Sequence, residues 1–504
     1  MSSEHLVRID RGTYPGRSPE IIAVPRRPHF FGTRDFLWTS HNGPWDYLEE
    51  VPLVFYGPGF VRAQGKISLD REVTVADVAP TLAELLDVPW PDARPGRPIG
   101  EALVPKRRRP VGPALVLVVV WDGGGTNVLD RWPEAWTTLA ELSQAGTSIS
   151  EAIVGSAPTV TPPVHTTIGT GAFPNQHGIV ELVQRRGDDV ADPFEALSPQ
   201  NLLIPSFADL YDPRTGNEAE IGLFAEEGWQ FGMMGHGAGL PGGDKDVAIT
   251  QGRGRGEIVT NSRFYSLPDY LIDLPGYERY TARVDRSDSK LDRKWRGHNV
   301  LYEHDLVYSP VWTLYQTKLI KTLWDREGYG NDDITDLFFV NYKFIDHAGH
   351  KFNMVNDEVA DAIRYSDEAL NELKEFLDSH VGRKKWVVVV TADHGQQPIS
   401  EATNGWPIDV DILSSDIAEH FDLPVDRLIE ADRPMSLWLD AETMRSEDIT
   451  EEEIADYVMS YTIEDSAQGR EVPESFENRL QERLFAAAFP SSRLSEIRRC
   501  VTGK

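Results

Sequence analysis

Cysteine is nearly absent from this chain of 504 residues, in which Cys500 is the single example. One thiol excludes a disulfide framework and a cysteine-based zinc site, so any metal ion must be held by histidine and carboxylate. Positive charge is also scarce, because 50 lysines and arginines stand against 80 acidic residues and leave a net charge of −30. This balance argues against long nucleic acids and anionic lipid surfaces as partners.

Long hydrophobic runs are missing too. The longest, Ala114–Trp121, is far shorter than the ~20 residues that a membrane-spanning helix needs. The first ten residues, MSSEHLVRID, contain no apolar stretch typical of a secretion signal. We therefore expect a soluble, cytoplasmic protein without a membrane partner. The 40% of hydrophobic residues is ample for a large core.

Short apolar runs bounded by turn residues predict buried strands, three of them parallel. The three are Ala114–Trp121, Asp336–Tyr342 and Lys385–Thr391, and a fourth run is Val51–Tyr56. Apolar residues at helical spacing lie between them, at Ala135–Gln144 and Asn356–His380. Strands alternating with helices favour an α/β fold with a doubly wound, mostly parallel sheet and helices on both faces. Such sheets bind ligands at the carboxyl ends of their strands.

Two other segments differ in composition from this core. Residues 184–331 are rich in Gly, Arg, Asp and Tyr, and we interpret them as an inserted cap or lid, with long surface loops as the alternative. Within them, His236 and Asp244 are candidate substrate contacts. Pro105–Pro113, which is basic, proline-rich and without periodicity, is interpreted as a linker.

An aspartate follows each of the three strongest strands. Asp122 follows the first, Asp346 the second with His350 four residues later, and Asp393 and His394 the third. One aspartate at a strand end is often only a turn residue. Three strand ends that meet at one edge, however, bring three aspartates and two histidines together, which favours a metal site. This set of nitrogen and oxygen donors suits Zn²⁺, with Mn²⁺ or Mg²⁺ as alternatives.

A further candidate lies in Ser156–Ile179, which reads SAPTVTPPVHTTIGTGAFPNQHGI. Thr161 precedes Pro162-Pro163, and proline is favoured in the first turn of a helix, so Thr161 is predicted to be an N-cap. Capping alone is one interpretation of this threonine. The other is a nucleophile, because a helix amino terminus offers a positive dipole end and free N–H groups to a phosphate.

Together these motifs resemble the alkaline phosphatase superfamily, most closely its type I phosphodiesterase/nucleotide pyrophosphatase branch. A strand-end aspartate, a threonine loop with TG and HGI downstream, a DxxxH pair and a DHG recur there in the same order. The resemblance implies that Thr161 is the nucleophile. It places one zinc on Asp122, Asp393, His394 and the Thr161 oxygen, and the other on Asp346 and His350.

The second zinc is then one ligand short. The family supplies another histidine after the DHG, but here only His420 follows, in an ordinary helix and turn. A segment like the expected one instead stands near the front, where Gly32–Gly59 contains SHNGPWDYLEEVPLVFYGPG. We infer a circular permutation that has moved the family's usual tail to the front, with His41 as the missing ligand. Because chain ends often lie close together at the surface, such a rearrangement is physically easy.

The expected organisation follows from this inference. Residues 1–104 form the permuted-in end of the α/β core, and 105–113 the linker. Residues 114–183 form the core with the nucleophile loop, 184–331 the cap, and 332–504 the remainder of the core.

One position departs from the family pattern. An asparagine that binds a phosphate oxygen usually follows the HGI, but here the corresponding stretch leads to Leu182, which cannot donate a hydrogen bond. Either a backbone N–H or a basic residue in Gln251–Arg263 replaces it, or the substrate differs. His165 and His177 are expected to be structural.

We therefore predict a two-metal hydrolase of small phosphate esters that acts through a phosphothreonine. Diesters or nucleotide pyrophosphates are expected ahead of monoesters, and the alternative from another class is a catalytically degenerate, metal-binding ligand sensor. Two divalent cations outweigh the charge of Asp122, Asp346 and Asp393, so the local field attracts an anion despite the acidic surface.

Overall fold

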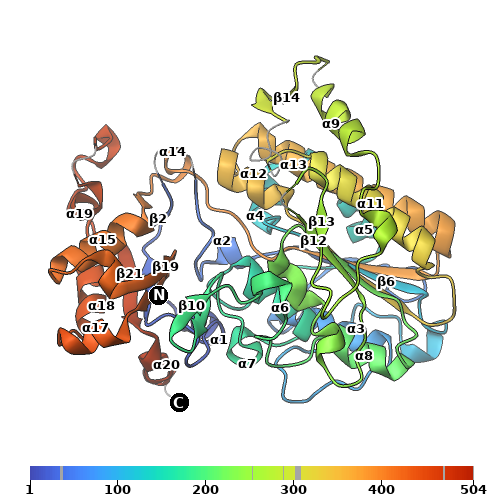
Figure 1. Ribbon diagram of the computed structural model, residues 1–504, viewed down its shortest axis with the longest axis horizontal. Helices are drawn as coiled ribbons and strands as arrows, with labels where there is room; N and C mark the ends of the chain where they lie inside the picture. The colour runs from blue at the N-terminus through green and yellow to red at the C-terminus, as the bar shows by residue number, and fades with distance from the viewer. Residues whose placement is uncertain (34–37, 253, 288, 301–307, 469–470, 503–504) are drawn as a thin grey trace.

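The computed structural model describes residues 1–33, 38–252, 254–287, 289–300, 308–468 and 471–502. Its largest feature is a mixed nine-stranded sheet in the order β13-β12-β11-β16-β6-β17-β3-β7-β4 (Figure 1). In that order the strands are Ile258–Val259, Val247–Gln251, Ile221–Phe224, Asp336–Tyr342, Leu115–Trp121, Trp386–Thr391, Leu53–Tyr56, Thr147–Ile149 and Gly65–Ile67. The five strands from β12 to β17 are mutually parallel, which confirms the predicted mostly parallel α/β sheet.

The central strand β6 explains why helices cover both faces. All seven of its residues are buried. Leu117 and Val119 enter one hydrophobic core while Val118 and Val120 enter the other, as the alternation of a strand requires. The first core packs under α5 (Thr137–Ala145), α11 (Val311–Glu327) and α13 (Asp357–Leu377). The second packs under α3 (Val78–Leu85), α6 (Thr161–Thr170) and α8 (Phe207–Thr215), on the other side of the sheet in Figure 1.

The strand from the front of the chain, β3, joins this sheet between β17 and β7 and runs antiparallel to both. Thr391, at the carboxyl end of β17, pairs with Leu53, at the start of β3. The segment before β3 therefore lies at the carboxyl edge of the parallel strands, so β3 has to run away from that edge. This geometry delivers residues near position 41 to the edge where the predicted site residues lie.

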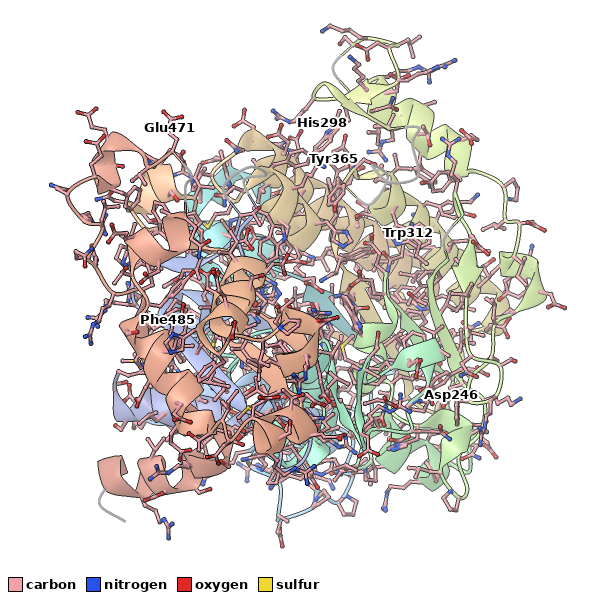
Figure 2. The ribbon with its side chains drawn as sticks, turned by 60° about the vertical axis from the view of Figure 1, so that its left-hand side comes forward. Asp246, His298, Trp312, Tyr365, Glu471 and Phe485 are labelled. Carbon is pink, nitrogen blue, oxygen red and sulfur yellow. The ribbon has the colours of Figure 1, made fainter. Side chains whose placement is uncertain are left out.

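Both ends of the chain build a second, smaller unit. A four-stranded antiparallel sheet has the order β19-β20-β1-β21, with strands Ile429–Arg433, Ser436–Leu439, Ile21–Pro25 and Phe485–Pro490. Its separate core contains Ile22 and Phe485, the latter labelled in Figure 2. Helices α1 (Ser3–Arg11) and α20 (Leu494–Thr502) pack against each other there, so the two termini lie close together (Figure 1). Much of the region after residue 400 thus differs from the predicted remainder of the main core.

The predicted cap also differs from what the structure contains. Residues 184–331 supply β11, β12 and β13 to the central sheet, because Ile221–Phe224 and most of Val247–Gln251 are buried. Outside the sheet, α9 (Tyr277–Asp285) packs on α11, and β14 (Lys294–Trp295) lies beyond it at the top of Figure 1. A large part of this interval is therefore core. Within the described ranges, no helix combines the length and apolar character needed to cross a membrane.

Candidate active site

The carboxyl edge of the central sheet collects the aspartates predicted from the strand ends. Asp122 directly follows β6, and Asp393 follows β17 after one intervening residue. Asp346 lies in the first turn of α12 (Phe344–Phe352), two residues into the helix that follows β16. All three carboxylates are buried. Three buried negative charges at one edge need compensation, which has to come from cations or hydrogen-bond donors.

Asp122, Asp393 and His394 form the first cluster, with ligand atoms within 4.8 Å of one another. Asp393 Oδ2 and His394 Nε2 lie 3.4 Å apart, and neither has a hydrogen-bond partner among the described residues although both are buried. Burial and the neighbouring Asp122 raise the pKa of Asp393 well above its ordinary value. An unpartnered carboxylate oxygen beside an unpartnered imidazole nitrogen fits a divalent cation.

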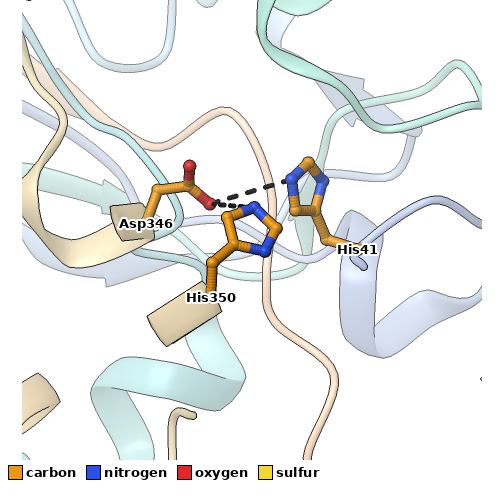
Figure 3. Close-up of side chains that lie close together, drawn as sticks. All are labelled: His41, Asp346 and His350. Carbon is orange, nitrogen blue, oxygen red and sulfur yellow. Dashed lines mark ion pairs between the residues drawn. The ribbon is translucent and has the colours of Figure 1, made fainter. Parts of the chain in front are cut away.

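His41, Asp346 and His350 form the second cluster, shown in Figure 3. Asp346 Oδ1 lies 3.3 Å from His350 Nε2 and 3.7 Å from His41 Nε2. His350 reaches Asp346 because the two residues are one helical turn apart in α12. His41 comes from the amino-terminal part of the chain, far from both in the sequence, and is brought to them by the fold alone.

The three histidines of the two clusters share one arrangement of the ring. Each places Nδ1 against a backbone carbonyl oxygen, which fixes this nitrogen as the donor and turns the lone pair of Nε2 toward the carboxylates. The distances are 2.6 Å from His41 to Thr159, 2.8 Å from His350 to Thr39 and 3.0 Å from His394 to Gly395. This is the orientation in which histidine binds a metal ion, so the residues present fit two cations.

Thr161 is the first residue of α6 and is buried beside the clusters. Val160 is the N-cap and no side chain caps this helix, so the prediction that Thr161 is an N-cap is wrong. Pro162 and Pro163 fill the next two positions and have no N–H groups, so the helix end offers fewer donors to a phosphate than predicted. With no capping bond to make, Thr161 Oγ1 instead accepts a hydrogen bond from Lys343 Nζ at 3.0 Å.

Lys343, which contacts both clusters, was not among the residues that the sequence motifs predicted. Its Nζ also donates to Asp122 Oδ1 at 3.0 Å and to Asp346 Oδ2 at 2.8 Å, so it joins the two clusters and Thr161. Burial lowers the pKa of Lys343, but the two carboxylates outweigh it and raise the pKa well above its ordinary value. The signal in the sequence was a lysine directly after a buried strand and three residues before Asp346, hence on the same side of α12.

A cavity of about 390 Å³ opens onto this constellation. Thr161, Lys343 and Leu182 line it together with the second cluster. Residues from the smaller unit border it as well, and they are Val410, Asp411, Asp432, Arg433 and Pro434. From the interval predicted as a cap, Glu227 and Trp229 take part.

Other candidates from the sequence lie elsewhere. His236 is hydrogen-bonded to Asp209 at 2.8 Å, and Asp244 belongs to an acidic cluster with Asp212 and Asp246, the last labelled in Figure 2. Neither His236 nor Asp244 lines the cavity, and no described residue of Gln251–Arg263 does so.

Two further histidines lie inside the packing around Thr161. His165 donates from Nδ1 to the Thr161 carbonyl oxygen at 2.9 Å, and its Nε2 accepts from Asn341, which also donates to Asp122. His177 lies 3.1 Å from the Thr167 hydroxyl. Burial lowers the pKa of His165 to about 4 and that of His177 to about 3, so both are neutral parts of the core.

Comparison with known proteins places this geometry in a family. The model of the type I phosphodiesterase/nucleotide pyrophosphatase family matches residues 116–487. The chain belongs to this family. Membership confirms the resemblance to the alkaline phosphatase superfamily, and the class named by the family is that of phosphoric ester hydrolases.

Curated relatives are distant and match in part. Alkaline phosphatase PhoV of Synechococcus elongatus is 24% identical over 300 residues, covering 50% of this chain and 53% of PhoV. Alkaline phosphatase PafA of Elizabethkingia meningoseptica is 25% identical over 142 residues, covering 27% of this chain and 26% of PafA. A protein of Myroides odoratus named calcium-transporting ATPase is 22% identical over 341 residues, covering 56% of this chain and 60% of its own. The chain thus spans between a quarter and three fifths of these relatives.

The fold itself has a solved counterpart. The crystal structure of wild-type alkaline phosphatase PafA superimposes with a TM-score of 0.52 at 18% identity, covering 75% of this chain and 84% of PafA. The two proteins share the α/β fold.

Proposed function

We propose that this chain is a metal-dependent hydrolase of phosphate esters that works through a covalent phosphothreonine at Thr161. The observation that carries the proposal is the environment of the Thr161 hydroxyl. Its Oγ1 shares the Lys343 ammonium with Asp122 and Asp346, one carboxylate from each His/Asp cluster, and it faces a cavity. This environment supports Thr161 as the nucleophile, because two candidate cation sites and room for a substrate lie beside it.

Two divalent cations are the cofactors that the residues fit. We propose that one is held by Asp122, Asp393, His394 and Thr161, and the other by His41, Asp346 and His350. When bound, they would supply Lewis-acid stabilisation of negative charge on the attacking and leaving oxygens. Three imidazoles among the donors favour Zn²⁺, with Mn²⁺ or Mg²⁺ as weaker fits.

The chain's own residues carry the covalent steps. Thr161 Oγ1 attacks phosphorus while its proton passes to water, and the bond from phosphorus to the leaving oxygen breaks. The leaving oxygen takes a proton from water. A second water then attacks phosphorus, the bond to Thr161 Oγ1 breaks, and a proton of that water restores the Thr161 hydroxyl. The product released is phosphate from a monoester or a phosphate monoester from a diester. Each displacement inverts phosphorus, so the overall reaction proceeds with retention of configuration.

The substrate we propose is a small phosphate ester, in keeping with a cavity of about 390 Å³ and an acidic surface that repels long nucleic acids. Two ester classes have support. The family supports diesters and nucleotide pyrophosphates. Monoesters are supported by one observation, the ammonium of Lys343 beside Thr161.

We also propose that the chain is a circular permutant of its family's usual order. Three observations support this: His41 lies in the second cluster, β3 lies inside the main sheet, and α1 packs against α20. Chain ends that lie side by side can be joined, and a chain can be opened at an exposed linker, without disturbing a core. Lys106–Arg108, in the predicted linker, is exposed and short.

The decisive experiment compares the zinc-loaded wild-type chain with Thr161→Ala on 4-nitrophenyl phosphate and on methyl 4-nitrophenyl phosphate. We expect turnover of at least one ester by the wild type, and a loss of at least about a thousandfold in the variant. Thr166→Ala is the matched control, because this buried hydroxyl of the same helix donates to the Pro162 carbonyl and does not line the cavity. Hydrolysis of neither ester by the wild type, or full activity of Thr161→Ala, would contradict the proposal.

A further inference from the structure

Lys343 is a buried lysine, and burial of its charged ammonium costs free energy unless other groups compensate it. The residue is 3% exposed, and its ammonium is removed from water at the junction of β16 and α12. An ammonium has three protons, and here they go to three acceptors: Asp122 Oδ1, Thr161 Oγ1 and Asp346 Oδ2. Two of these belong to the candidate metal clusters, and the third is the proposed nucleophile. The positive charge of Lys343 therefore lies between the proposed nucleophile and both candidate metal clusters.

Permanent positive charge is scarce around Thr161, although the polar side chains of Ser40, Asn42 and His347 also line the cavity. Pro162 and Pro163 remove two N–H groups from the start of α6, and Leu182 presents hydrocarbon to the cavity. Among the described residues that line the cavity, only Lys343 and Arg433 carry a permanent positive charge. Arg433 comes from β19 in the smaller unit, whereas Lys343 touches Thr161 itself.

We propose that Lys343 keeps its hydrogen bond to Thr161 Oγ1 and turns a proton that it now donates to Asp122 or Asp346 toward a non-bridging oxygen of the phosphoryl group under transfer, and that its charge makes the site select phosphomonoesters over diesters. This inference rests on the proposed function. It reverses the preference that the sequence suggested.

The physical basis is the charge of the two ester classes. The phosphoryl group of a monoester is a dianion at neutral pH with three unsubstituted oxygens, whereas that of a diester is a monoanion with two. A fixed cation within hydrogen-bond distance of the transferred group interacts roughly twice as strongly with the dianion. Two divalent cations and three carboxylates together give the site a small net positive charge, and Lys343 adds one more unit to it. Because Lys343 is buried, this extra charge is only weakly screened by salt.

The test replaces Lys343 by methionine, which has nearly the same length and no charge. We expect Lys343→Met to lower kcat/KM for 4-nitrophenyl phosphate by about 100-fold or more, and that for methyl 4-nitrophenyl phosphate by about tenfold or less. The monoester-to-diester ratio should therefore fall at least about tenfold. Lys351→Met is the matched control, because this exposed lysine lies in the same helix α12 and does not line the cavity.

Two readouts without turnover accompany the rates. Inorganic phosphate, titrated calorimetrically into the zinc-loaded proteins, should bind Lys343→Met at least about tenfold more weakly than the wild type. Zinc content should stay the same or rise, because the ammonium that shares Asp122 and Asp346 with a cation is gone. A merely structural lysine would instead lower zinc content, and it would lower both ester rates alike.

The outcomes separate the inference from the proposed function. Equal losses on the two esters, or unchanged phosphate binding, would overturn the role of Lys343 while wild-type turnover and inactive Thr161→Ala still upheld the hydrolase. If Lys343→Met does not fold, the monoester-to-diester ratio of kcat/KM is measured for Lys343→Arg, which keeps the positive charge. A ratio preserved within about threefold upholds the inference, and a collapsed ratio overturns it.

Discussion

The imidazole of His41 stacks on the imidazole of His394, with ring centroids 3.5 Å apart and planes inclined by 7°. The two residues belong to different clusters and lie far apart in the sequence. Each also anchors Nδ1 on a backbone carbonyl. The two candidate cation sites are thus in direct contact, so a substitution near His41 should weaken cation binding at both.

The first prediction concerns the ligand from the front of the chain. His41→Ala should lower zinc content about as much as His350→Ala, by roughly 10–100-fold in affinity, because both present Nε2 to Asp346 Oδ1. Metal analysis after dialysis measures this directly. His420→Ala is the control, since His420 is exposed and stacks on Tyr457 in the smaller unit. Loss of zinc from His420→Ala, with His41→Ala unaffected, would place the ligand after the DHG instead.

The second prediction restores the amide that the family usually carries. Leu182 lines the cavity with Thr161 and Lys343, so Leu182→Asn puts a neutral donor within the site. We expect kcat/KM for methyl 4-nitrophenyl phosphate to rise by about tenfold, the value of one hydrogen bond to a charged oxygen. Leu182→Ala, which enlarges the cavity without adding a donor, separates the amide from the space. An equal rise in both variants would count against this account of Leu182.

The third prediction concerns stability and pH. Glu49 is fully buried; burial outweighs Arg8 and raises the pKa of Glu49 to about 8. Between the unfolded value near 4.5 and about 8, the unfolded chain loses this proton while the folded chain keeps it. Stability therefore falls as pH rises across this window, by up to about 5 kcal/mol.

Glu49→Gln removes this titration. Relative to wild type, its free energy of unfolding should be higher at pH 8.5 than at pH 5, that is, the variant should be relatively more stable at the higher pH; urea denaturation of the metal-free proteins at both pH values measures this. Exposed Glu477→Gln, as control, should change by no more than about 0.5 kcal/mol at either pH. A gap that stays constant between the two pH values would contradict the raised pKa.

The fourth prediction tests the permutation. A chain that runs from residue 114 to 504 and continues through a short Gly/Ser linker into residues 1–104 should fold, bind zinc and keep turnover within about a factor of ten. The reason is that α1 already packs on α20, while the new ends fall at the exposed linker. Opening the chain inside α13 instead should abolish folding, because that helix lies in the main core. Failure of the first rearranged chain to fold would defeat the permutation.

Local chemistry explains which parts of the fold the sequence predicted. The runs now seen as β6, β16 and β17 are apolar and short, which is typical of strands that are buried on both faces of a sheet. The direction of β3 and the position of 184–331 were not predictable in this way. An apolar strand has the same pattern whichever way it runs, and a Gly-rich segment says little about what lies beside it.

The sequence by itself determined the chemical inventory: no thiolate ligands, aspartates at strand ends, DxxxH and DHG spacings, and a threonine before two prolines. Tertiary structure alone decided the rest. It brought His41 to Asp346, took capping away from Thr161 and set the Lys343 ammonium between both clusters. The physical reason is that ligand types and spacings are properties of neighbours along the chain. The charge at a reacting centre, in contrast, is summed over groups that only the packed sheet brings within a few ångströms.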